Sequence, residues 1–430
     1  MKEDNGDMRI KRKVSRMWLL VEAVLVFVIG WFAVDNELAK LLRRAIIPMG
    51  WDVGNVLVVP VRPLPEYDPE YRPQAAGGSA VAQDFQRIGT VLASLEGVES
   101  TAPCGLFFPG IDNSRFDRAI RDSTHFLECC MLYRVMGTDF MEVFGYEWVL
   151  PENGPSVADD ALGSVVVSED VADFLFPGEN PIGRSFESLG GVLNTVVGVV
   201  PRQKLREPTG VPVPVIISNI PSVSAGDISS GLASWVVRVK DGTDTEALIP
   251  YLNRTLSVRA VFGNLRTDSV YALSNKLESN DDDLTFVVLV YVLLNLVLGA
   301  LSYWLLYSRK SKDEFGVRLA MGATAAALRR RAVLDSFRIS VIGAAIGMVI
   351  VFNLVLVTGR DFATKGAVYF GVYPAAETLA PWPVLTSPFL SALMVTLVVA
   401  AVVFAVNALA ALLSVWKVSR MRPSETLREE

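Results

Sequence analysis

Histidine and cysteine are scarce in this 430-residue chain, which has one His and three Cys. With His125 alone, the chain cannot form an H-E-x-x-H pair or any other site that needs several His ligands. It also has no G-x-x-x-x-G-K-[ST] loop to cradle nucleotide phosphates and no G-x-S-x-G turn to present a nucleophilic serine. The sequence therefore offers no catalytic constellation, and a structural role is expected for His125.

The three cysteines do not make a disulfide framework. Cys129 and Cys130 are adjacent, and on an extended segment they point to opposite faces, so a bond between them is not expected. Two interpretations stay open. All three can be small buried apolar residues, or Cys104 can pair with one of the others if the segment lies outside the cytoplasm.

A nucleic-acid partner is not expected, because basic residues are nowhere interleaved with aromatic ones in a stripe. The formal net charge of −6 says less than its distribution. Basic residues gather beside long apolar runs, where membrane topology requires them.

Apolar residues make up 51% of the chain and are concentrated toward its two ends. Four runs are long enough to cross about 30 Å of hydrocarbon as helices. The predicted spans are residues 17–34, 284–307, 332–357 and 389–416. Glu22, inside the first span, is either a functional intramembrane acid or a residue at the membrane interface.

The first helix is expected to continue beyond the membrane as far as residue 47. Apolar residues recur at helical spacing from Leu38 to Ile46, and Pro48 ends the pattern. The extension is predicted to be a stalk, with an interfacial helix lying flat on the membrane as the alternative.

Basic flanks place both termini and the segment 308–331 in the cytoplasm. The expected order is therefore as follows: a basic tail (1–16), a first span with its stalk (17–47), an external domain (48–283), a second span (284–307), a cytoplasmic loop (308–331), a third span (332–357), an external loop (358–388), a fourth span (389–416) and a cytoplasmic tail (417–430).

The external domain has the texture of a soluble α+β fold. Two βα units are predicted, one over residues 55–103 and one over residues 233–262, in which 258–262 is a strand. Short strands bounded by Gly and Pro lie between them, at 163–167, 184–187, 193–200 and 213–219, with a helix near 169–176. We expect a split ferredoxin-like subdomain that carries an inserted, mainly β subdomain.

The cytoplasmic segment has a short helix at its centre. Glu314, Arg318 and Met321 recur at helical spacing, and Phe315, Leu319 and Gly322 recur one position later. Gly322 gives a stop signal and Thr324 a cap for the next helix. A surface helix between two spans is a suitable docking element for a cytoplasmic partner.

These residues carry a family resemblance. The run from Glu314 through Gly316 and Ala323 to Thr324, EFGVRLAMGAT, resembles the E-I-G-x-R-R-A-L-G-A-[ST] signature of MacB/FtsX-type ABC transporter permeases, with Phe315 replacing the aliphatic residue and Leu319 the second Arg. The stretches at 138–145, 165–169, 176–184 and 196–200 are similar to parts of the MacB periplasmic core domain. Residues 422–428 resemble the usual family ending.

The resemblance implies a non-catalytic permease subunit in the inner (plasma) membrane, in contact with membrane lipids and without a cofactor of its own. ATP would be bound by a separate cytoplasmic ABC ATPase that docks on Glu314, Phe315, Gly316, Arg318, Leu319, Met321, Gly322 and Ala323. Further implied partners are a second permease protomer, identical or paralogous, and a periplasmic adaptor with an outer-membrane channel. Peptides, drugs or lipoproteins would be exported.

Two other functions are consistent with the same sequence. A mechanotransmission or signalling module would regulate a periplasmic hydrolase or sense peptides without transport. A membrane-anchored enzyme is the third, with no visible catalytic residues to support it.

Gly343 and Gly347 form a G-x-x-x-G pattern in the third span. Such small residues allow two helices to approach closely. We expect them to pack against a helix of the same protomer, with dimerisation as the alternative.

Overall fold

The computed structural model describes residues 2–71, 78–110, 115–156, 160–205, 208, 210–259, 263–267, 269–278, 283–358 and 388–418. The chain divides into two units. We call Met1–Lys40, Asp281–Ala363 and Ser387–Glu430 the helical unit, and Leu41–Asn280 with Thr364–Thr386 the α+β unit. The predicted external loop at 358–388 and tail at 417–430 lie almost wholly outside the described residues.

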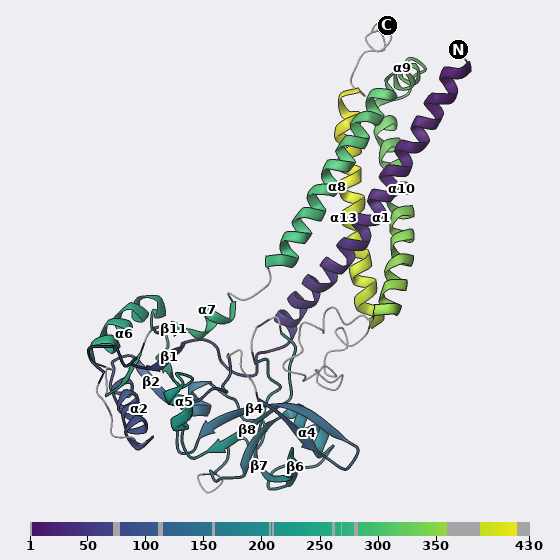
Figure 1. The fold of residues 1–430 in the computed structure, drawn as a ribbon. Helices are drawn as coiled ribbons and strands as arrows, with labels where there is room; N and C mark the ends of the chain where they lie inside the picture. The colour runs from purple at the N-terminus through teal and green to yellow at the C-terminus, as the bar shows by residue number, and fades with distance from the viewer. Residues whose placement is uncertain are drawn as a thin grey trace. The chain divides into compact units, whose positions relative to one another are not determined.

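The helical unit is built from four long helices, drawn as the upright bundle of Figure 1. They are α1 (Lys2–Ile46), α8 (Asp283–Lys310), α10 (Ala325–Thr358) and α13 (Pro388–Val418). Each contains a stretch long and apolar enough to cross a membrane, namely Met17–Ile46, Phe286–Lys310, Ala325–Val355 and Ala392–Trp416. The four predicted spans are confirmed as helices, and α1 continues to Ile46 as the periodicity indicates.

The segment 308–331 contains the short central helix that the sequence predicts. α8 extends to Lys310, the short helix α9 covers Lys312–Ala320, and α10 already begins at Ala325. The basic run 329–331 therefore lies in the first turns of α10. The reason is local, because Thr324 caps α10 four residues after α9 ends.

The first part of the α+β unit is a five-stranded sheet with two helices. Its strands follow the order β10-β1-β9-β2, and β11 also pairs with β1. β9 pairs antiparallel with both β1 and β2, so β1 and β2 run parallel on either side of it. This is the split ferredoxin-like arrangement that the two βα units predict. The elements are β1 (Val56–Pro63), α2 (Gly78–Ala93), β2 (Val98–Cys104), β9 (Ser234–Val239), α6 (Thr245–Arg259), β10 (Leu265–Thr267) and β11 (Tyr271–Ala272).

Both faces of this sheet are buried, and β1 shows why. Val56 and Val58 belong to one apolar cluster, whereas Leu57 and Val59 belong to another that includes Phe85 of α2. Successive side chains of a strand point to opposite faces, so a continuous apolar run suits a sheet that is covered on both sides. Asp244 caps α6 by accepting from the backbone N–H groups of residues 246 and 247.

The second part of the α+β unit is a closed barrel of six strands in the order β3-β4-β8-β5-β7-β6. Its strands are β3 (Arg115–Ile120), β4 (Phe126–Val135), β5 (Ser164–Ser168), β6 (Ser185–Ser188), β7 (Val192–Val200) and β8 (Val215–Ile220), with α4 (Glu169–Leu175) after β5. The inserted β subdomain is thus confirmed. β3 and β4 were not among the predicted strands. The barrel closes between β3 and β6 through one residue pair, Ile120 with Glu187.

Two local expectations come out differently. Residues up to Arg259, the start of the strand expected at 258–262, belong to helix α6, whose period continues through the buried Leu252 and Leu256. The cysteines are buried as thiols, so the bridge from Cys104 is not formed. Cys129 and Cys130 enter different apolar clusters, as alternation along β4 requires. Further short helices among the described residues are α3 (Phe140–Val143), α5 (Ala225–Ser229) and α7 (Leu273–Glu278).

Candidate functional site

Helix α9 follows α8 after a single residue, Ser311. The N–H of Ser311 donates to the carbonyl of Tyr307 at 3.0 Å, and the N–H of Phe315 donates to the carbonyl of Ser311 at 2.9 Å. Ser311 is itself buried. The hydrogen-bonded backbone therefore passes from α8 into α9 without a free linker, so α9 cannot reorient without disturbing the end of α8.

One face of α9 is anchored in the helical unit by Phe315. The ring is 5% exposed, and it lies 6.3 Å from the ring of Tyr307 in an edge-to-face arrangement. Leu319, one turn later, is half-buried against the same cluster. The cluster that receives both side chains contains Leu19, Ala300, Tyr303, Trp304, Leu328, Ala332, Ala410, Ala411 and Val415.

Phe315 and Leu319 are two positions at which the chain departs from the signature that it resembles, and both lie on this inward face. An apolar side chain at 319 gains from burial there, whereas a charged one would lose hydration. The two departures therefore strengthen the attachment of α9 to its own unit.

The other face of α9 is presented outward. Glu314 and Arg318 form an i,i+4 ion pair at 2.6 Å. Val317 is 48% exposed and Met321 is 76% exposed. Charged and apolar groups thus alternate over about two turns, which is a suitable mixture for docking against a second protein.

The turn after α9 is closed by a Schellman motif. The N–H of Ala323 donates to the carbonyl of Arg318 at 2.9 Å, and the N–H of Gly322 donates to the carbonyl of Leu319 at 3.0 Å. Gly322 has φ +92°, which only glycine adopts without strain. Thr324 then caps α10 by accepting from the N–H of Ala327 at 3.2 Å. The Gly stop and the Thr cap that the sequence predicts are both present.

Gly343 and Gly347 face α1 of the same chain. A Cβ added at Gly343 would lie 3.0 Å from the Cβ of Ala23, and one added at Gly347 would lie 2.6 Å from Cδ1 of Phe27. The close helix approach that the G-x-x-x-G pattern predicts is therefore made within the protomer.

The aromatic end of the last span belongs to this region and was not predicted. The Arg329 guanidinium lies 4.2 Å from the centroid of the Trp416 ring, a cation–π contact between α10 and α13. Leu328 beside it is buried in the cluster that holds Phe315. Only the basic run at 329–331 and the Trp at the end of a span hinted at this contact in the sequence.

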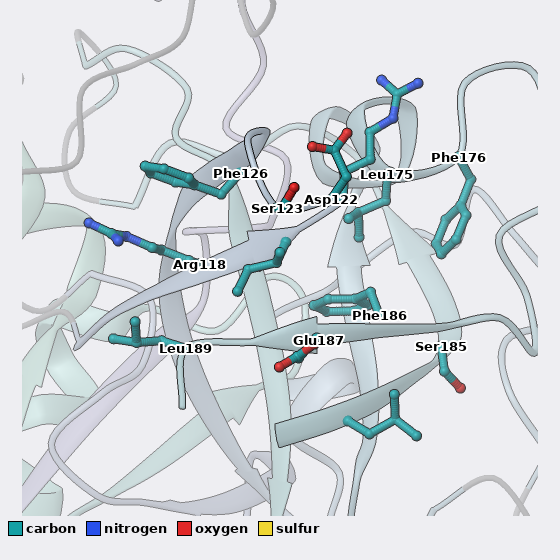
Figure 2. Close-up of a pocket in the computed structure, with 13 residues that line it drawn as sticks. Arg118, Asp122, Ser123, Phe126, Leu175, Phe176, Ser185, Phe186, Glu187 and Leu189 are labelled. Atoms are coloured by element: carbon teal, nitrogen blue, oxygen red, sulfur yellow. The ribbon is translucent and has the colours of Figure 1, made fainter. Parts of the chain in front are cut away.

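A cavity of about 740 Å³ opens on the barrel of the α+β unit (Figure 2). Arg118 and Phe126 lie on one side of it, Phe176 and Ser185 on the other, and Phe186 and Glu187 between them. It is located at the β3–β6 seam. The remaining lining residues are Ile120, Arg121, Asp122, Ser123, Leu175, Leu189 and Leu193.

Two charged residues of the cavity lining, Arg118 and Asp122, interact with side chains next to them. Arg118 pairs with Glu128 at 3.5 Å, and its guanidinium lies over the Phe126 ring. The N–H of Thr124, its hydroxyl, and His125 hold the pKa of Asp122 well below its usual range. His125 is thus an exposed turn residue bonded to Asp122. In the described part of the chain, no group of three or more His, Cys, Asp or Glu could hold a metal ion.

Comparison with known proteins agrees with this architecture. The chain is 23% identical over 229 residues to the macrolide export ATP-binding/permease protein MacB 2 of Yersinia pestis bv. Antiqua, covering 51% of this chain and 32% of that protein. It is 22% identical over 248 residues to MacB of Escherichia coli, covering 55% of this chain and 37% of that protein. The chain thus aligns with about a third of the length of these relatives.

Solved structures are more distantly similar. The periplasmic region of MacB from Actinobacillus actinomycetemcomitans covers 54% of this chain and 96% of its own, at 16% identity and a TM-score of 0.30. The extracellular domain of the noncanonic ABC-type transporter YknZ from Gram-positive bacteria covers 49% and 98%, at 13% identity and a TM-score of 0.30. The family model described as the MacB-like periplasmic core domain matches residues 25–255, more than half of the chain. The chain therefore belongs to the family of membrane proteins that carry a MacB-like periplasmic core domain.

Proposed function

We propose that this chain is the permease subunit of a MacB/FtsX-type ABC transporter, coupling ATP hydrolysis by a separate ATPase to movement of its periplasmic domain. The observation that carries the proposal is the geometry of α9. It is a short helix held on one side by Phe315 and closed at its end by Gly322, with Glu314, Val317 and Met321 directed outward. A rigid helix with an exposed mixed face can receive a push from a cytoplasmic partner and pass it to α8 and α10.

The rest of the proposal follows from this role. ATP belongs to the partner, so the chain needs no cofactor of its own. Four spans are too few to enclose a pathway, and a second permease protomer, identical or paralogous, is expected beside the first. We place the chain in the inner membrane with both termini cytoplasmic, by the distribution of basic residues. Relatives named for macrolide and syringafactin export support export as the class of activity.

Co-purification tests the docking helix. The tagged chain is isolated from its own cells in mild detergent, and bound proteins are identified by mass spectrometry, with ATP hydrolysis measured on the complex. The variant carries Glu314→Arg together with Arg318→Glu, which keeps an ion pair within α9 but exchanges the charges that a partner meets. The matched control exchanges Asp335 and Arg338, which pair at 3.5 Å on α10.

An ABC ATPase is expected with the wild type and the control, and at least tenfold less of it with the α9 variant. Equal amounts in all three would locate docking outside α9. If no ATPase accompanies the wild type, the transporter proposal fails, and a signalling or anchored-enzyme function takes its place.

A further inference from the structure

Lys204 is a buried lysine whose side chain ends on backbone carbonyls. It is 1% exposed and lies on the connection between β7 and β8. Its Nζ donates to the carbonyls of Arg43 at 2.8 Å, Ile47 at 2.6 Å and Pro208 at 2.7 Å. Three donors of one ammonium thus meet three acceptors, the full hydrogen-bonding capacity of a charged lysine.

Two of these carbonyls belong to the end of α1. A helix leaves its last carbonyls without intrahelical partners and carries partial negative charge there. The carbonyl of Arg43 already accepts from the N–H of Ile47 at 3.0 Å, and Pro48 has no N–H with which to extend the pattern. Lys204 supplies a cation and two hydrogen bonds at this helix end, from a point more than 150 residues away in the chain.

The backbone around Lys204 reinforces the attachment. The N–H of Lys204 donates to the carbonyl of Met49 at 2.9 Å, and the indole of Trp51 donates to the carbonyl of Lys204 at 2.7 Å. At Gly50, which has φ +80°, an added Cβ would lie 2.2 Å from the carbonyl oxygen of Arg202. The chain leaving α1 and the β7–β8 connection therefore touch backbone to backbone, and only glycine fits at 50.

The same connection is tied into the rest of the α+β unit. The Tyr146 hydroxyl donates to the side-chain oxygen of the fully buried Gln203 at 3.0 Å. The N–H of Gly110 donates to the carbonyl of Leu205 at 2.7 Å. Trp51, Tyr146 and Leu205 share one apolar cluster that includes residues of both the sheet and the barrel. Residues 203–205 are therefore connected to both the sheet and the barrel of the α+β unit.

We propose that Lys204 is a positioning residue that fastens the last turn of α1 to the β7–β8 connection, so that movement of α1 enters the periplasmic domain at this point. The transmission part rests on the proposed permease function, whereas the fastening itself does not. Apolar packing alone lets a helix end slide or rotate, because it has no preferred direction. The two charge-assisted hydrogen bonds to Arg43 and Ile47 fix both the position and the rotation of the helix end. Burial, and secondarily Arg43, lower the pKa of Lys204 to about 8, so the cation is still the main form at neutral pH.

Distance measurement tests the fastening in the full chain, purified in detergent. Cysteines replace Leu41, on α1, and Leu193, on β7, which are 62% and 66% exposed in the α+β unit, and both receive nitroxide labels. The native cysteines are at most 1% exposed, and labelling of the chain without new cysteines checks that they do not react. Pulsed electron paramagnetic resonance then gives the distribution of label distances.

The wild type is expected to give a narrow distribution, and Lys204→Met one at least twice as wide. Lys204→Arg keeps the charge and should restore part of the narrowness. Lys240→Met, at an exposed position, should match the wild type. A Lys204→Met distribution as narrow as the wild type would overturn the proposal. If that variant does not fold, Trp51→Phe and Lys204→Arg decide, since unchanged distributions in both would also overturn it.

Hydrogen exchange in the complex with the ATPase tests the transmission. ATP is expected to change amide exchange in the barrel of the wild type. In Lys204→Met the ATPase should still bind and hydrolyse ATP, with the change in the barrel reduced at least twofold. An undiminished change would refute a transmitting role. A wild type that binds no ATPase would count against the proposed function, and the label distances would still decide the fastening.

Discussion

The helical unit and the α+β unit bury their apolar side chains in different ways. In β1, four consecutive residues from Val56 to Val59 are at most 1% exposed. In α8, by contrast, Phe286, Tyr291 and Leu298 are each at least 60% exposed. In the α+β unit a continuous apolar run thus marks a strand buried on both faces, whereas in the helical unit it marks the length of a span, of which only one side packs against other helices.

Glycine shows the difference at two comparable positions. Gly89 of α2 admits the Trp235 ring, and Gly347 of α10 admits Phe27 of α1. Trp235 is held by its indole hydrogen bond to the carbonyl of Phe85 at 3.1 Å and by stacking on the Phe85 ring at 5.3 Å. Replacing each of these glycines by alanine therefore measures how readily the surrounding side chains adjust to one added methyl group.

Gly89→Ala is expected to have the largest effect. An added Cβ would lie 2.1 Å from Cζ2 of Trp235, and the doubly held ring has little freedom to shift. Overpacking of this kind costs about 1–3 kcal/mol, and the better helix propensity of Ala returns at most about 1 kcal/mol. We expect a net loss of about 2 kcal/mol in the free energy of unfolding, measured by thermal unfolding with the exposed Gln86→Ala as control. An unchanged free energy of unfolding would mean that the side chains around Trp235 can adjust to the added methyl group.

The α+β unit also buries a charged side chain, the Lys204 cation, and this makes its stability depend on pH. The pKa is about 8 in the fold against an ordinary 10.5, so between these values the unfolded chain binds a proton that the folded chain has released. The free energy of unfolding should therefore rise with pH across this window, by up to about 1.4 kcal/mol per pH unit, and be flat below it. Unfolding of the wild type and Lys204→Met at pH 7, 8 and 9 tests this. The prediction would be contradicted if the free energy of unfolding depended on pH in the same way in both proteins.

Gly347→Ala is expected to cost less than Gly89→Ala. The nearest atom, Cδ1 of Phe27, would lie 2.6 Å from the new Cβ, so a small shift between α1 and α10 can relieve the contact. After the same gain in helix propensity we expect a net loss of about 1 kcal/mol. Gly343→Ala, with its nearest contact at 3.0 Å, should be close to neutral and serves as the matched comparison. A larger loss at 343 than at 347 would reverse the order that the distances predict.

The Glu314–Arg318 pair should give the smallest effect on stability. The pair is partly exposed, and such i,i+4 pairs contribute about 0.3–0.5 kcal/mol. Glu314→Gln should therefore leave thermal unfolding almost unchanged, with the small difference disappearing at high salt. A loss above 1 kcal/mol would indicate that the outward face of α9 is structural rather than reserved for a partner.

How far the sequence predicts the fold depends on the range of the interactions. The spans, the βα units and the cap at Thr324 follow from periodicity and local hydrogen bonding, and all are present. β3 was missed because its residues, RFDRAI, are charged and short, and the strand exists by pairing with β4. Residues 258 and 259, the start of the strand expected at 258–262, are helical because local β propensity gave way to the helical period of α6.

The candidate site divides along the same line. The α9 helix and its Gly322 turn could be predicted, since every bond that closes them lies within a few residues. The position of Phe315 against α1, α8, α10 and α13 could not, because it depends on helices far apart in the chain. Nothing in the sequence around Lys204 indicates its role. A lysine in a loop suggests an exposed charge, and only the folded chain brings carbonyls of α1 to it.

The continuity of α1 has one more consequence. From Met17 to Ile46 it is an unbroken helix of 30 residues, about 45 Å long. A rod of that length acts as a lever, and each degree of tilt at one end displaces the other by about 0.8 Å. A tilt of a few degrees thus becomes a displacement of several ångströms, comparable to the rise of half a helical turn or more.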